Sequence, residues 1–477
     1  MSTITRDISA ARSQTHDLII IGGGIYGAML MLEACKAGLK PLMIDRSDFG
    51  GQTSFNNLRI VHGGLRYLQS AHLSRFHESV RERQWFLKTF PELVFPISCL
   101  MPLYGQLMKN KLTLKAALSI NDVLSRKRNR GVAQSHHLAN GQILSVSETI
   151  KQFPGVRTAG LKGAALWYDA VMPDCHRILM ETIRWSVAAQ GSALNYVSAN
   201  ELITSGNKTV GIIATDEIGK EQFELRSDVV INATGPACLE TASRLDRLVQ
   251  DLYVPSLAWN LLLDREPLST GAVAVQAPGT DSQVYFAHSL NGRLLFGTGH
   301  QPVSDRCDAS ISPASLDRML SDINRAIPGM ALTTADILHV FQGQLPVKKS
   351  NSTQLCDEAR IVDHSSEGGP SGLYSLSGVK FTTARSTAQS LISTIRQTHS
   401  FAKRENHLFP DRPEPSPYAL HSETMTIDER KRRIQNLLNT ECPQYLGDLF
   451  YRRSNLAMSP SMAQTLADES DLPLHWE

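Results

Sequence analysis

One short stretch of the sequence gathers residue types that can hold an anion close to the backbone. It runs from Ser54 to Gln69, reads SFNNLRIVHGGLRYLQ and places His62 before two glycines. The first of them, Gly63, has no side chain, so a bound group can approach the backbone closely there. Arg59 and Arg66 add two permanent positive charges on either side of the glycines. The stretch predicts either the wall of a ligand site or a turn between helices with solvated arginines.

A glycine pattern near the N-terminus predicts a dinucleotide site. The apolar run from Leu18 to Ile21 is typical of a parallel strand that is buried on both faces. Gly22, Gly24 and Gly27 follow it, and the chain then continues with helical apolar spacing. In this context the first glycine permits the tight turn, the second admits a pyrophosphate and the third lets the helix pack on the strand. The start of the helix supplies free amides and the positive end of its dipole for phosphates.

An acidic residue lies where the ribose of such a cofactor would be held. A second apolar run, Pro41 to Ile44, ends at Asp45, about twenty residues after the glycines. A carboxylate there accepts hydrogen bonds from a ribose 2′-hydroxyl and disfavours a 2′-phosphate. The alternative for a lone glycine motif is a purely structural turn, but the sequence of strand, turn, helix, strand and acid favours the dinucleotide.

Two later segments favour a cofactor that is longer than NAD. Residues 227–238, SDVVINATGPAC, predict a buried strand that ends in an Ala-Thr-Gly sequence at 233–235. Residues 372–395, GLYSLSGVKFTTARSTAQSLISTI, predict a strand, a turn at Gly378 and an amphipathic helix. A cofactor stretched from the N-terminal glycines to this distant helix end would need both segments as additional contacts.

These motifs together resemble the FAD-dependent glycerol-3-phosphate dehydrogenases, which belong to the wider D-amino-acid-oxidase-like group of flavoproteins. The resemblance covers about residues 15–400, and the run from His62 to Leu68 makes it specific. It implies FAD as the cofactor, with the diphosphate on the first glycine loop and the adenosine ribose on Asp45. It also implies that the turn before Lys380 covers the isoalloxazine with backbone amides, and that Arg66 faces the substrate cavity. The residues assigned to the cofactor are Gly22, Gly24, Ile25, Tyr26, Gly27, Asp45, Arg46, Thr53, Ser54, Arg59, His62, Gly63, Ala199, Ala233, Thr234, Gly235, Gly378, Val379, Lys380, Phe381 and Thr382.

Three residues are candidates for the chemistry itself. Oxidation of a C–H bond next to oxygen or nitrogen needs a base for the O–H or N–H proton and a flavin N5 that accepts hydride. Positive groups stabilise the charge on the reduced ring and on an anionic substrate, and Arg66 and Lys380 fit this role. The resemblance implies an acid where the chain has His300, so this histidine is the candidate base. The alternatives are a structural ion pair for Arg66 and a merely packed or solvated His300.

The sequence departs from the family where a substrate phosphate would be held. The resemblance implies an arginine within the segment 343–347, but the chain reads GQLPV there and has Leu345 at that position. A second family arginine aligns with Val362, and Arg360 is the nearby cation on the same strand face that would compensate. Leucine cannot form the bidentate, charge-assisted bonds that select phosphate. We therefore expect a larger or less anionic alcohol or amine in place of glycerol 3-phosphate.

Composition excludes several classes of protein. The net charge of +2 gives no field that favours nucleic acid, so we expect a small-molecule substrate and no nucleic-acid partner. The seven cysteines are scattered and never form C-x-x-C, which argues against a disulfide framework and a metal site and suits a reducing compartment. The N-terminus lacks the apolar core of a signal peptide, and no apolar run approaches a membrane span. These features predict a cytoplasmic protein.

A basic segment raises the question of contact with a membrane surface. Residues 107–130 contain seven Lys and Arg residues and only one acid, Asp122, around leucines at helical spacing. A basic amphipathic helix can lie on an anionic membrane. The resemblance implies a peripheral membrane enzyme that passes electrons to quinone, with oxygen as the alternative acceptor. The segment therefore predicts peripheral contact with the inner face of a membrane, and a solvated helix is the alternative.

The predicted fold class is α/β. A doubly wound, Rossmann-like FAD domain comes from residues 15–80, 150–240 and 345–400, interleaved with an α+β substrate domain with an antiparallel sheet from 81–149 and 241–344. Residues 401–477 form a proline-rich linker and a short helical C-terminal segment. The predicted function is FAD-dependent oxidation of a CH–OH or CH–NH group, as in a glycerol-3-phosphate dehydrogenase with altered specificity. The alternatives are an amine or amino-acid oxidase that uses oxygen, and an FAD-binding partner subunit without catalysis.

Overall fold

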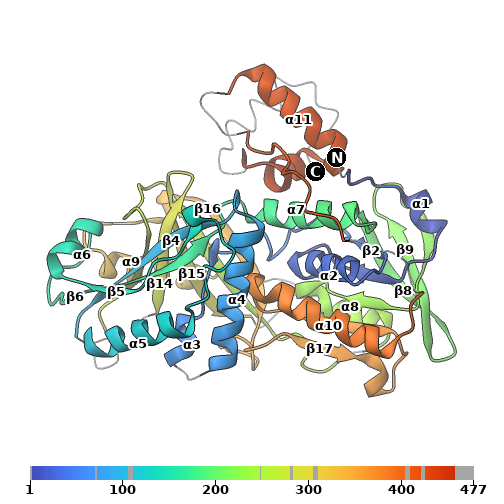
Figure 1. Ribbon diagram of the computed structural model, residues 1–477, viewed down its shortest axis with the longest axis horizontal. Helices are drawn as coiled ribbons and strands as arrows, with labels where there is room; N and C mark the ends of the chain where they lie inside the picture. The colour runs from blue at the N-terminus through green and yellow to red at the C-terminus, as the bar shows by residue number, and fades with distance from the viewer. Residues whose placement is uncertain are drawn as a thin grey trace.

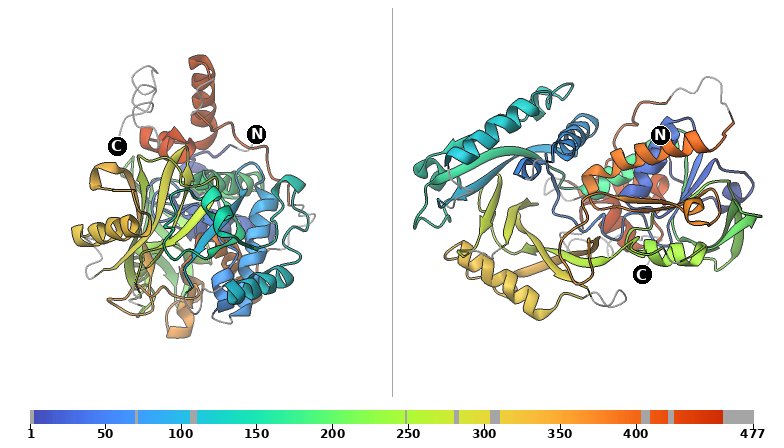
Figure 2. Two further views of the ribbon diagram at one scale, coloured as in Figure 1. Left: turned by 90° about the vertical axis from the view of Figure 1, so that its left-hand side faces the viewer. Right: turned by 90° about the horizontal axis from the view of Figure 1, so that it is seen from below.

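The computed structural model describes residues 3–69, 72–105, 111–247, 249–279, 283–303, 310–402, 409–420 and 425–456. Two sheet-containing bodies lie side by side, and the C-terminal helix α11 (Ile427–Glu441) stands over one of them (Figure 1). Within the described residues one body contains a six-stranded sheet and the other a nine-stranded sheet, and the view from below shows the nine-stranded sheet curling away from the six-stranded one (Figure 2).

The first body is built on a mostly parallel sheet. Within the described ranges its strand order is β17-β18-β11-β1-β2-β7, and only the pair of β17 and β18 is antiparallel. β1 has four apolar residues that are all buried, as expected of a strand covered on both faces. The bounds are β1 Leu18–Ile21, β2 Pro41–Ile44, β7 Ser192–Leu194, β11 Val230–Asn232, β17 Arg360–Asp363 and β18 Leu373–Ser377.

Different layers cover the two faces of the parallel sheet. Helices α2 (Ile25–Lys36), α7 (Cys175–Ala188) and α10 (Ala384–Thr398) share one hydrophobic cluster with it and lie together in Figure 1. On the other face a second cluster joins the sheet to β8 (Val197–Ser205), β9 (Lys208–Asp216) and β10 (Gln222–Arg226), which pair antiparallel. The predicted α/β fold class is confirmed, with an antiparallel layer in place of helices over part of one face.

The second body is built on a mostly antiparallel sheet. Among the described residues its order is β16-β12-β15-β14-β13-β4-β6-β3, with β5 paired to β6, and only β13 and β4 run parallel. Helix α9 (Pro313–Ala326) packs on one face and α5 (Lys111–Leu124) on the other. The bounds are β3 Ile60–Val61, β4 Phe95–Leu103, β5 Gln142–Leu144, β6 Gly163–Val171, β12 Pro255–Leu263, β13 Ala272–Gln276, β14 Val284–Leu290, β15 Arg293–Pro302 and β16 Ile337–Pro346.

One segment contributes to both sheets. The range 150–240 was assigned to the FAD domain, but β6 within it pairs with β4 and β3 in the antiparallel sheet. An apolar run predicts a buried strand without saying which sheet it joins. The rest of the division into domains stays a prediction. Parts of the predicted domains lie outside the described residues, at 70–71, 106–110, 248, 280–282, 304–309, 403–408, 421–424 and 457–477.

Further helices complete the two bodies. They are α1 (Ile8–Arg12), α3 (Leu65–Gln69), α4 (Leu73–Thr89), α6 (Val146–Gln152), α8 (Cys238–Leu245) and a π-helical turn, η7 (Asp448–Arg453). Thr426 caps α11 by accepting the amide of Glu429 at 3.2 Å.

A buried ion pair between α4 and α10 gives a test of this packing. Arg385 donates from Nε and Nη2 to Glu82, at 3.0 and 2.7 Å, and the carboxylate is fully buried. Replacing Arg385 by Met leaves the buried Glu82 carboxylate without its main partner, so we expect the free energy of unfolding to fall by about 3 kcal/mol. The loss lies at the lower end of the usual range because Arg81 remains 3.6 Å from Glu82. Urea unfolding followed by the fluorescence of Trp85, which lies under the Arg385 guanidinium, measures it.

The matched control is the double variant Glu82→Met with Arg385→Met. It removes the stranded charge and is expected to recover most of the lost stability. A single variant as stable as the wild type would show that the pair does not hold the helices together.

Candidate active site

The carboxyl ends of the parallel strands meet at one edge of their sheet. The amide of Gly22, directly after β1, donates to Ile44 O at 2.8 Å, and the amide of Ala233 donates to Ile21 O at 2.8 Å. Gly22 has φ +106°, and a Cβ there would lie 2.6 Å from Ala233 O. Glycine is therefore required at this crossing, which is where ligands bind in open α/β sheets.

The start of α2 lies at the same edge. Gly24 is the N-cap and provides no side-chain cap, while the amide of Ile25 donates to Ser54 Oγ at 2.9 Å. A Cβ on Gly24 would have only Ser54 Oγ within 4 Å, at 3.1 Å. A Cβ on Gly27 would lie 1.8 Å from Gly22 O, so α2 can pack this closely only without it. The helix end has the form of a phosphate site.

Asp45 follows β2 at the position predicted for the ribose. Its carboxylate accepts the amides of Gly23 and Ser47, at 2.7 and 2.9 Å, and burial raises its pKa. The Ser47 hydroxyl also donates to it at 3.2 Å, so one of the about four acceptor positions of a carboxylate remains for a ribose hydroxyl. The other predicted residues nearby are an exposed Arg46 and Ala199, which is buried on β8 where it pairs with Ala214.

The Ala-Thr-Gly segment after β11 lies beside the glycine turn. Thr234 Oγ1 donates to Asn232 Oδ1 at 2.8 Å, and Gly235 has φ +56°. Gly22 touches the backbone of Ala233 and Thr234. The structure therefore brings two sequence-distant predicted segments, 22–27 and 233–235, to one place.

Tyr26 connects α2 to the turn after β18. Its hydroxyl accepts the amides of Val379 and Lys380, at 3.1 and 3.2 Å, and donates to Lys380 O at 3.0 Å. A Cβ on Gly378 would lie 2.1 Å from the Tyr26 ring, so the ring rests directly on the glycine backbone. Two of the amides expected to cover the isoalloxazine are thus engaged within the chain. Phe381 and Thr382 open the 3₁₀ turn η6 (Phe381–Thr383) that leads into α10.

A cation cluster lies at this turn. Lys380 Nζ is 4.3 Å from the centre of the Tyr67 ring, and burial together with the nearby Arg66 charge lowers the pKa of Lys380 to about 8. Arg66 is exposed, and neither cation has an ion-pair partner among the residues that the structure describes. The structure thus brings two of the three predicted catalytic residues together. Lys380 carries its charge below about pH 8 and loses it above.

A buried carboxylate fixes the His-Gly-Gly segment. Asp169 on β6 accepts the amide of Gly63 at 2.7 Å and contacts His62 Nδ1 at 3.2 Å. Arg83 of α4 also donates to Asp169, and a Cβ on Gly63 would lie 1.9 Å from Arg83 Nη1. Burial alone would raise the pKa of Asp169, but His62 and Arg83 hold it well below its usual range. Sequence reasoning gave no role to Asp169 or Arg83, although Asp169 stands out as a charge within the apolar run of β6.

His300 lies on the antiparallel sheet and not beside the cation cluster. Its Nε2 is 2.7 Å from Ser256 Oγ on β12, and Ser256 donates to Leu345 O at 3.0 Å. Since the serine proton goes to that carbonyl, Nε2 carries the imidazole proton and Nδ1 is left as the acceptor. Burial lowers the pKa of His300 to about 4, so the ring is neutral at neutral pH. No described contact joins it to Arg66 or Lys380.

Thr53 links the antiparallel sheet to the glycine turn. Its Oγ1 donates to Gln344 O at 3.1 Å, and a Cβ on Gly343 would lie 3.1 Å from the Thr53 side chain. Leu345, in the predicted phosphate position, pairs with Ser256 across β12 and β16. The segment 343–347 therefore lies against the loop that carries Thr53 and Ser54.

Arg59 is not brought to the glycine turn. It has φ +63° and is buried, with its guanidinium 4.9 and 5.0 Å from the ring centres of Phe55 and Phe341. Its Nη1 donates to Cys175 Sγ. Its predicted place at the cofactor stays a prediction that these contacts do not support.

The prediction that Arg360 compensates for the family arginine replaced by Val362 is wrong. Val362 is buried in a hydrophobic cluster with α8 residues Cys238 and Leu239, at the edge of the parallel sheet. Arg360 donates from Nη1 to Gln250 O at 2.8 Å. The period of two places both side chains on one face, but that face packs on α8 and the 249–253 loop.

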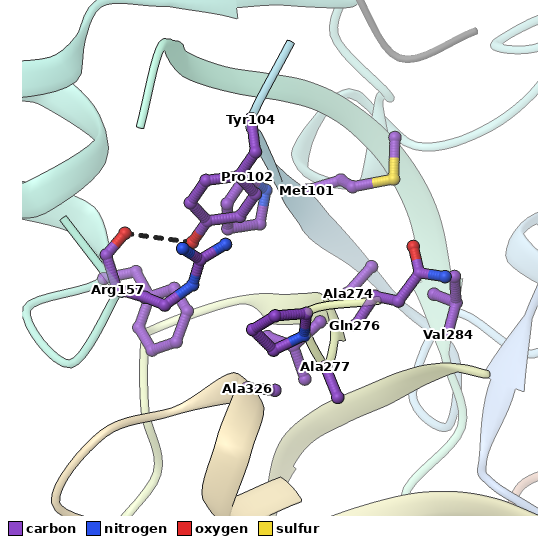
Figure 3. A pocket seen from close by; sticks show the side chains of 12 residues that line it. Met101, Pro102, Tyr104, Arg157, Ala274, Gln276, Ala277, Val284 and Ala326 are labelled. Atoms are coloured by element: carbon purple, nitrogen blue, oxygen red, sulfur yellow. Dashed lines mark hydrogen bonds between the residues drawn. The ribbon is translucent and has the colours of Figure 1, made fainter. Parts of the chain in front are cut away.

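A separate hollow of about 40 Å³ lies on the antiparallel sheet. Figure 3 shows the ring of Tyr104 beside the Arg157 guanidinium. The guanidinium carbon lies 4.0 Å from the centre of that ring, and Tyr104 Oη donates to Arg157 O at 3.0 Å. Met101, Ala274 and Ala326 line the rest together with their neighbours. None of the predicted site residues borders this hollow.

Comparison with known proteins agrees with this geometry. Residues 17–393 match the model of the family described as FAD dependent oxidoreductase. A glycerol-3-phosphate dehydrogenase of Synechocystis sp. is 26% identical over 463 residues, which cover 94% of this chain and 81% of that protein.

Two solved structures share the fold. The glycerol-3-phosphate dehydrogenase from Bacillus halodurans, complexed with FAD, has a TM-score of 0.62 and 22% identity over 82% of this chain and 66% of that one. The glycine oxidase from Bacillus cereus has a TM-score of 0.53 and 14% identity over 81% of this chain and 96% of that one.

The open space at Gly24 yields a test of the dinucleotide site. In Gly24→Val the branched side chain would fill the space at the start of α2 where a pyrophosphate approaches the backbone. We expect loss of bound flavin with the fold retained, because the only nearby atom is the Ser54 hydroxyl. Flavin absorbance per chain and far-ultraviolet circular dichroism measure the two properties. A folded variant with the wild-type flavin ratio would mean that the glycine is only structural.

Proposed function

The chain belongs to the family of FAD-dependent oxidoreductases, and we propose that it oxidises a CH–OH or CH–NH group of a small or mid-sized polar substrate. It is related to the glycerol-3-phosphate dehydrogenases. The observation that carries the proposal is the pair of cations, Arg66 and Lys380, at the turn after β18, where the parallel strands end.

The described residues fit FAD. The start of α2, where the N-cap Gly24 has no side chain, suits the diphosphate, and the remaining acceptor position of Asp45 suits a ribose hydroxyl. The turn held by Tyr26 lies at the opposite end of the same sheet edge, beside β18. When bound, FAD supplies the hydride acceptor at flavin N5.

The chain's own residues would divide the remaining work. Arg66 and Lys380 would hold an anionic substrate group and stabilise negative charge that develops beside them. His300 is the proposed base, since its ring is neutral and Nδ1 can accept a proton. Ser256 would fix that tautomer through the bond at Nε2.

The proposed substrate class follows from Leu345, which stands where the family arginine would bind a phosphate. Leu345 offers no charge beside Ser256, and Arg360 is engaged with Gln250 O, away from this strand pair. A phosphate would therefore rely on Arg66 and Lys380 alone. This favours an alcohol or amine with less negative charge than glycerol 3-phosphate.

Two alternatives remain as separate proposals. One is an amine or amino-acid oxidase that uses oxygen, because the chain shares its fold with the glycine oxidase and the cation pair could also hold an amino-acid carboxylate. A non-catalytic FAD-binding subunit is the other, because cofactor and substrate contacts use different residues. Flavin reduction by any substrate excludes the subunit, and peroxide production separates an oxidase from a dehydrogenase that passes electrons to quinone.

We further propose contact with the inner face of a membrane through α5. Leu114 and Leu118 of α5 are buried, while the opposite face exposes Leu112 (81%), Ile120 (52%) and Val123 (67%). An apolar stripe flanked by lysines is the pattern of an interfacial helix. Residues 107–110 of the predicted segment lie outside the described residues.

Two other findings bear on location. In the described part of the chain no helix has both the length and the apolar character to cross a bilayer. We propose a reducing, cytoplasmic setting, and within the described ranges no disulfide joins the cysteines.

The α5 proposal predicts binding to anionic vesicles. The wild type is expected to co-sediment with vesicles of phosphatidylserine and phosphatidylcholine and not with phosphatidylcholine alone. Leu112→Glu with Ile120→Glu should reduce the bound fraction by about tenfold or more, because both changes place charge on the inserted face. Ile218→Glu, at an apolar position that is 41% exposed on another element, is the matched control and should bind like the wild type. Equal binding by the α5 variant would exclude this face.

The substrate proposal predicts slow reduction by glycerol 3-phosphate. One lost charge-assisted hydrogen bond weakens affinity by about 10- to 150-fold. Anaerobic titration of the flavin should therefore show poor reduction by glycerol 3-phosphate and faster reduction by some neutral polyol or amine. Leu345→Arg should strengthen binding of the phosphate, and Leu345→Met is its uncharged control. Saturable wild-type reduction at micromolar glycerol 3-phosphate would show that another cation replaces the arginine.

A further inference from the structure

The C-terminal segment 441–456 is tied to the loop that follows β2 by fully buried charges. Arg453 donates from Nη1 and Nη2 to the carboxylate of Asp48, at 2.7 and 2.6 Å, and both side chains are fully buried. Burial alone would raise the pKa of Asp48, but Arg453 and Arg452 hold it below its usual range. We call residues 45–53 the cofactor loop, because they run from Asp45 to Thr53.

A second buried pair anchors the same segment on α7. Arg177 donates from Nη1 and Nη2 to Glu441, at 2.7 and 2.9 Å, and both side chains are fully buried. Arg177 and Arg184 also contact Glu181. The segment is therefore fixed to α7 and to the cofactor loop at once.

The cofactor loop lies between this segment and the turn before β8. Asn195 Nδ2 donates to Asp48 Oδ1 at 3.0 Å and to Cys442 O at 3.1 Å, which bridges the loop and the segment. The Tyr196 amide donates to Ser47 O at 3.1 Å, and its hydroxyl donates to Asp448 at 2.8 Å.

The same contacts reach the predicted ribose residue. The Val197 amide donates to Asp45 O at 2.7 Å. On the far side of the loop, a Cβ on Gly51 would lie 3.3 Å from the Arg452 guanidinium. The loop therefore has little freedom while the C-terminal segment is docked.

We propose that the C-terminal segment is a cofactor clamp in which Arg453 acts as a positioning residue. Through Asp48 it holds the cofactor loop in the conformation that presents the Asp45 carboxylate to the adenosine ribose. This deepens the proposed function, because it assigns to the C-terminal helical segment a part in retaining FAD. Arg453 itself does not contact the cofactor in this account.

The direct test is the dissociation constant of FAD, measured by flavin fluorescence on the full chain after the cofactor has been removed. Arg453→Met should raise the dissociation constant by about tenfold or more, because it strands Asp48 and frees the loop. Arg453→Lys keeps the charge and should recover part of the affinity. Arg433→Met is the matched control, since it breaks the pair of Arg433 with Glu429 on α11, away from the loop. Its dissociation constant should equal that of the wild type.

A milder variant covers the case in which Arg453→Met does not fold. Arg452 is partly exposed and lies 3.5 Å from Asp48, so Arg452→Met should fold and raise the dissociation constant by about threefold. Wild-type affinity in both folded variants, or an equal loss in Arg433→Met, would overturn the clamp. The wild-type titration separates the two levels, because a wild type that binds no FAD refutes the proposed function itself.

Discussion

The close approach of α2 to the ends of β1 and β11 is the constraint on which the rest of the structure depends. A Cβ at position 27 would lie 1.8 Å from Gly22 O, and one at position 22 would lie 2.6 Å from Ala233 O. A side chain at position 27 would push α2 away from the turn after β1, and one at position 22 would push that turn away from the segment after β11. The amides at the start of α2 point at the sheet edge only because these glycines allow the contact.

Two connections extend from this contact to the rest of the site. Tyr26, on the first turn of α2, holds the backbone of Lys380 and so places its ammonium group over the Tyr67 ring. Asp45, after β2, belongs to the loop that the C-terminal segment holds through Asp48. One end of the site is thus fixed from the helix start and the other from the C-terminus. In the proposed site the antiparallel sheet has Leu345 where the family arginine would lie, and this difference underlies the proposed preference for a less anionic substrate.

The sequence predicted the features whose causes are local. Gly22, Gly24, Gly27 and Asp45 have roles set by a short strand-turn-helix-strand unit, so their spacing alone indicated them. Features that depend on distant contacts were missed. Tyr26 bonds to Lys380 across 354 residues and Arg453 to Asp48 across 405, and neither pairing leaves a periodic signal.

Other errors have the same origin. The alternation of a strand correctly placed Arg360 and Val362 on one face, but only the tertiary structure shows that this face packs on α8. Arg59 was predicted to lie at the cofactor, but its guanidinium lies against the rings of Phe55 and Phe341. The measurement that tests the central claim most directly is an absorbance scan of the purified chain before and after acid precipitation. The account predicts one FAD per chain, released into the supernatant, and a colourless protein that cannot be reconstituted with FAD would contradict it.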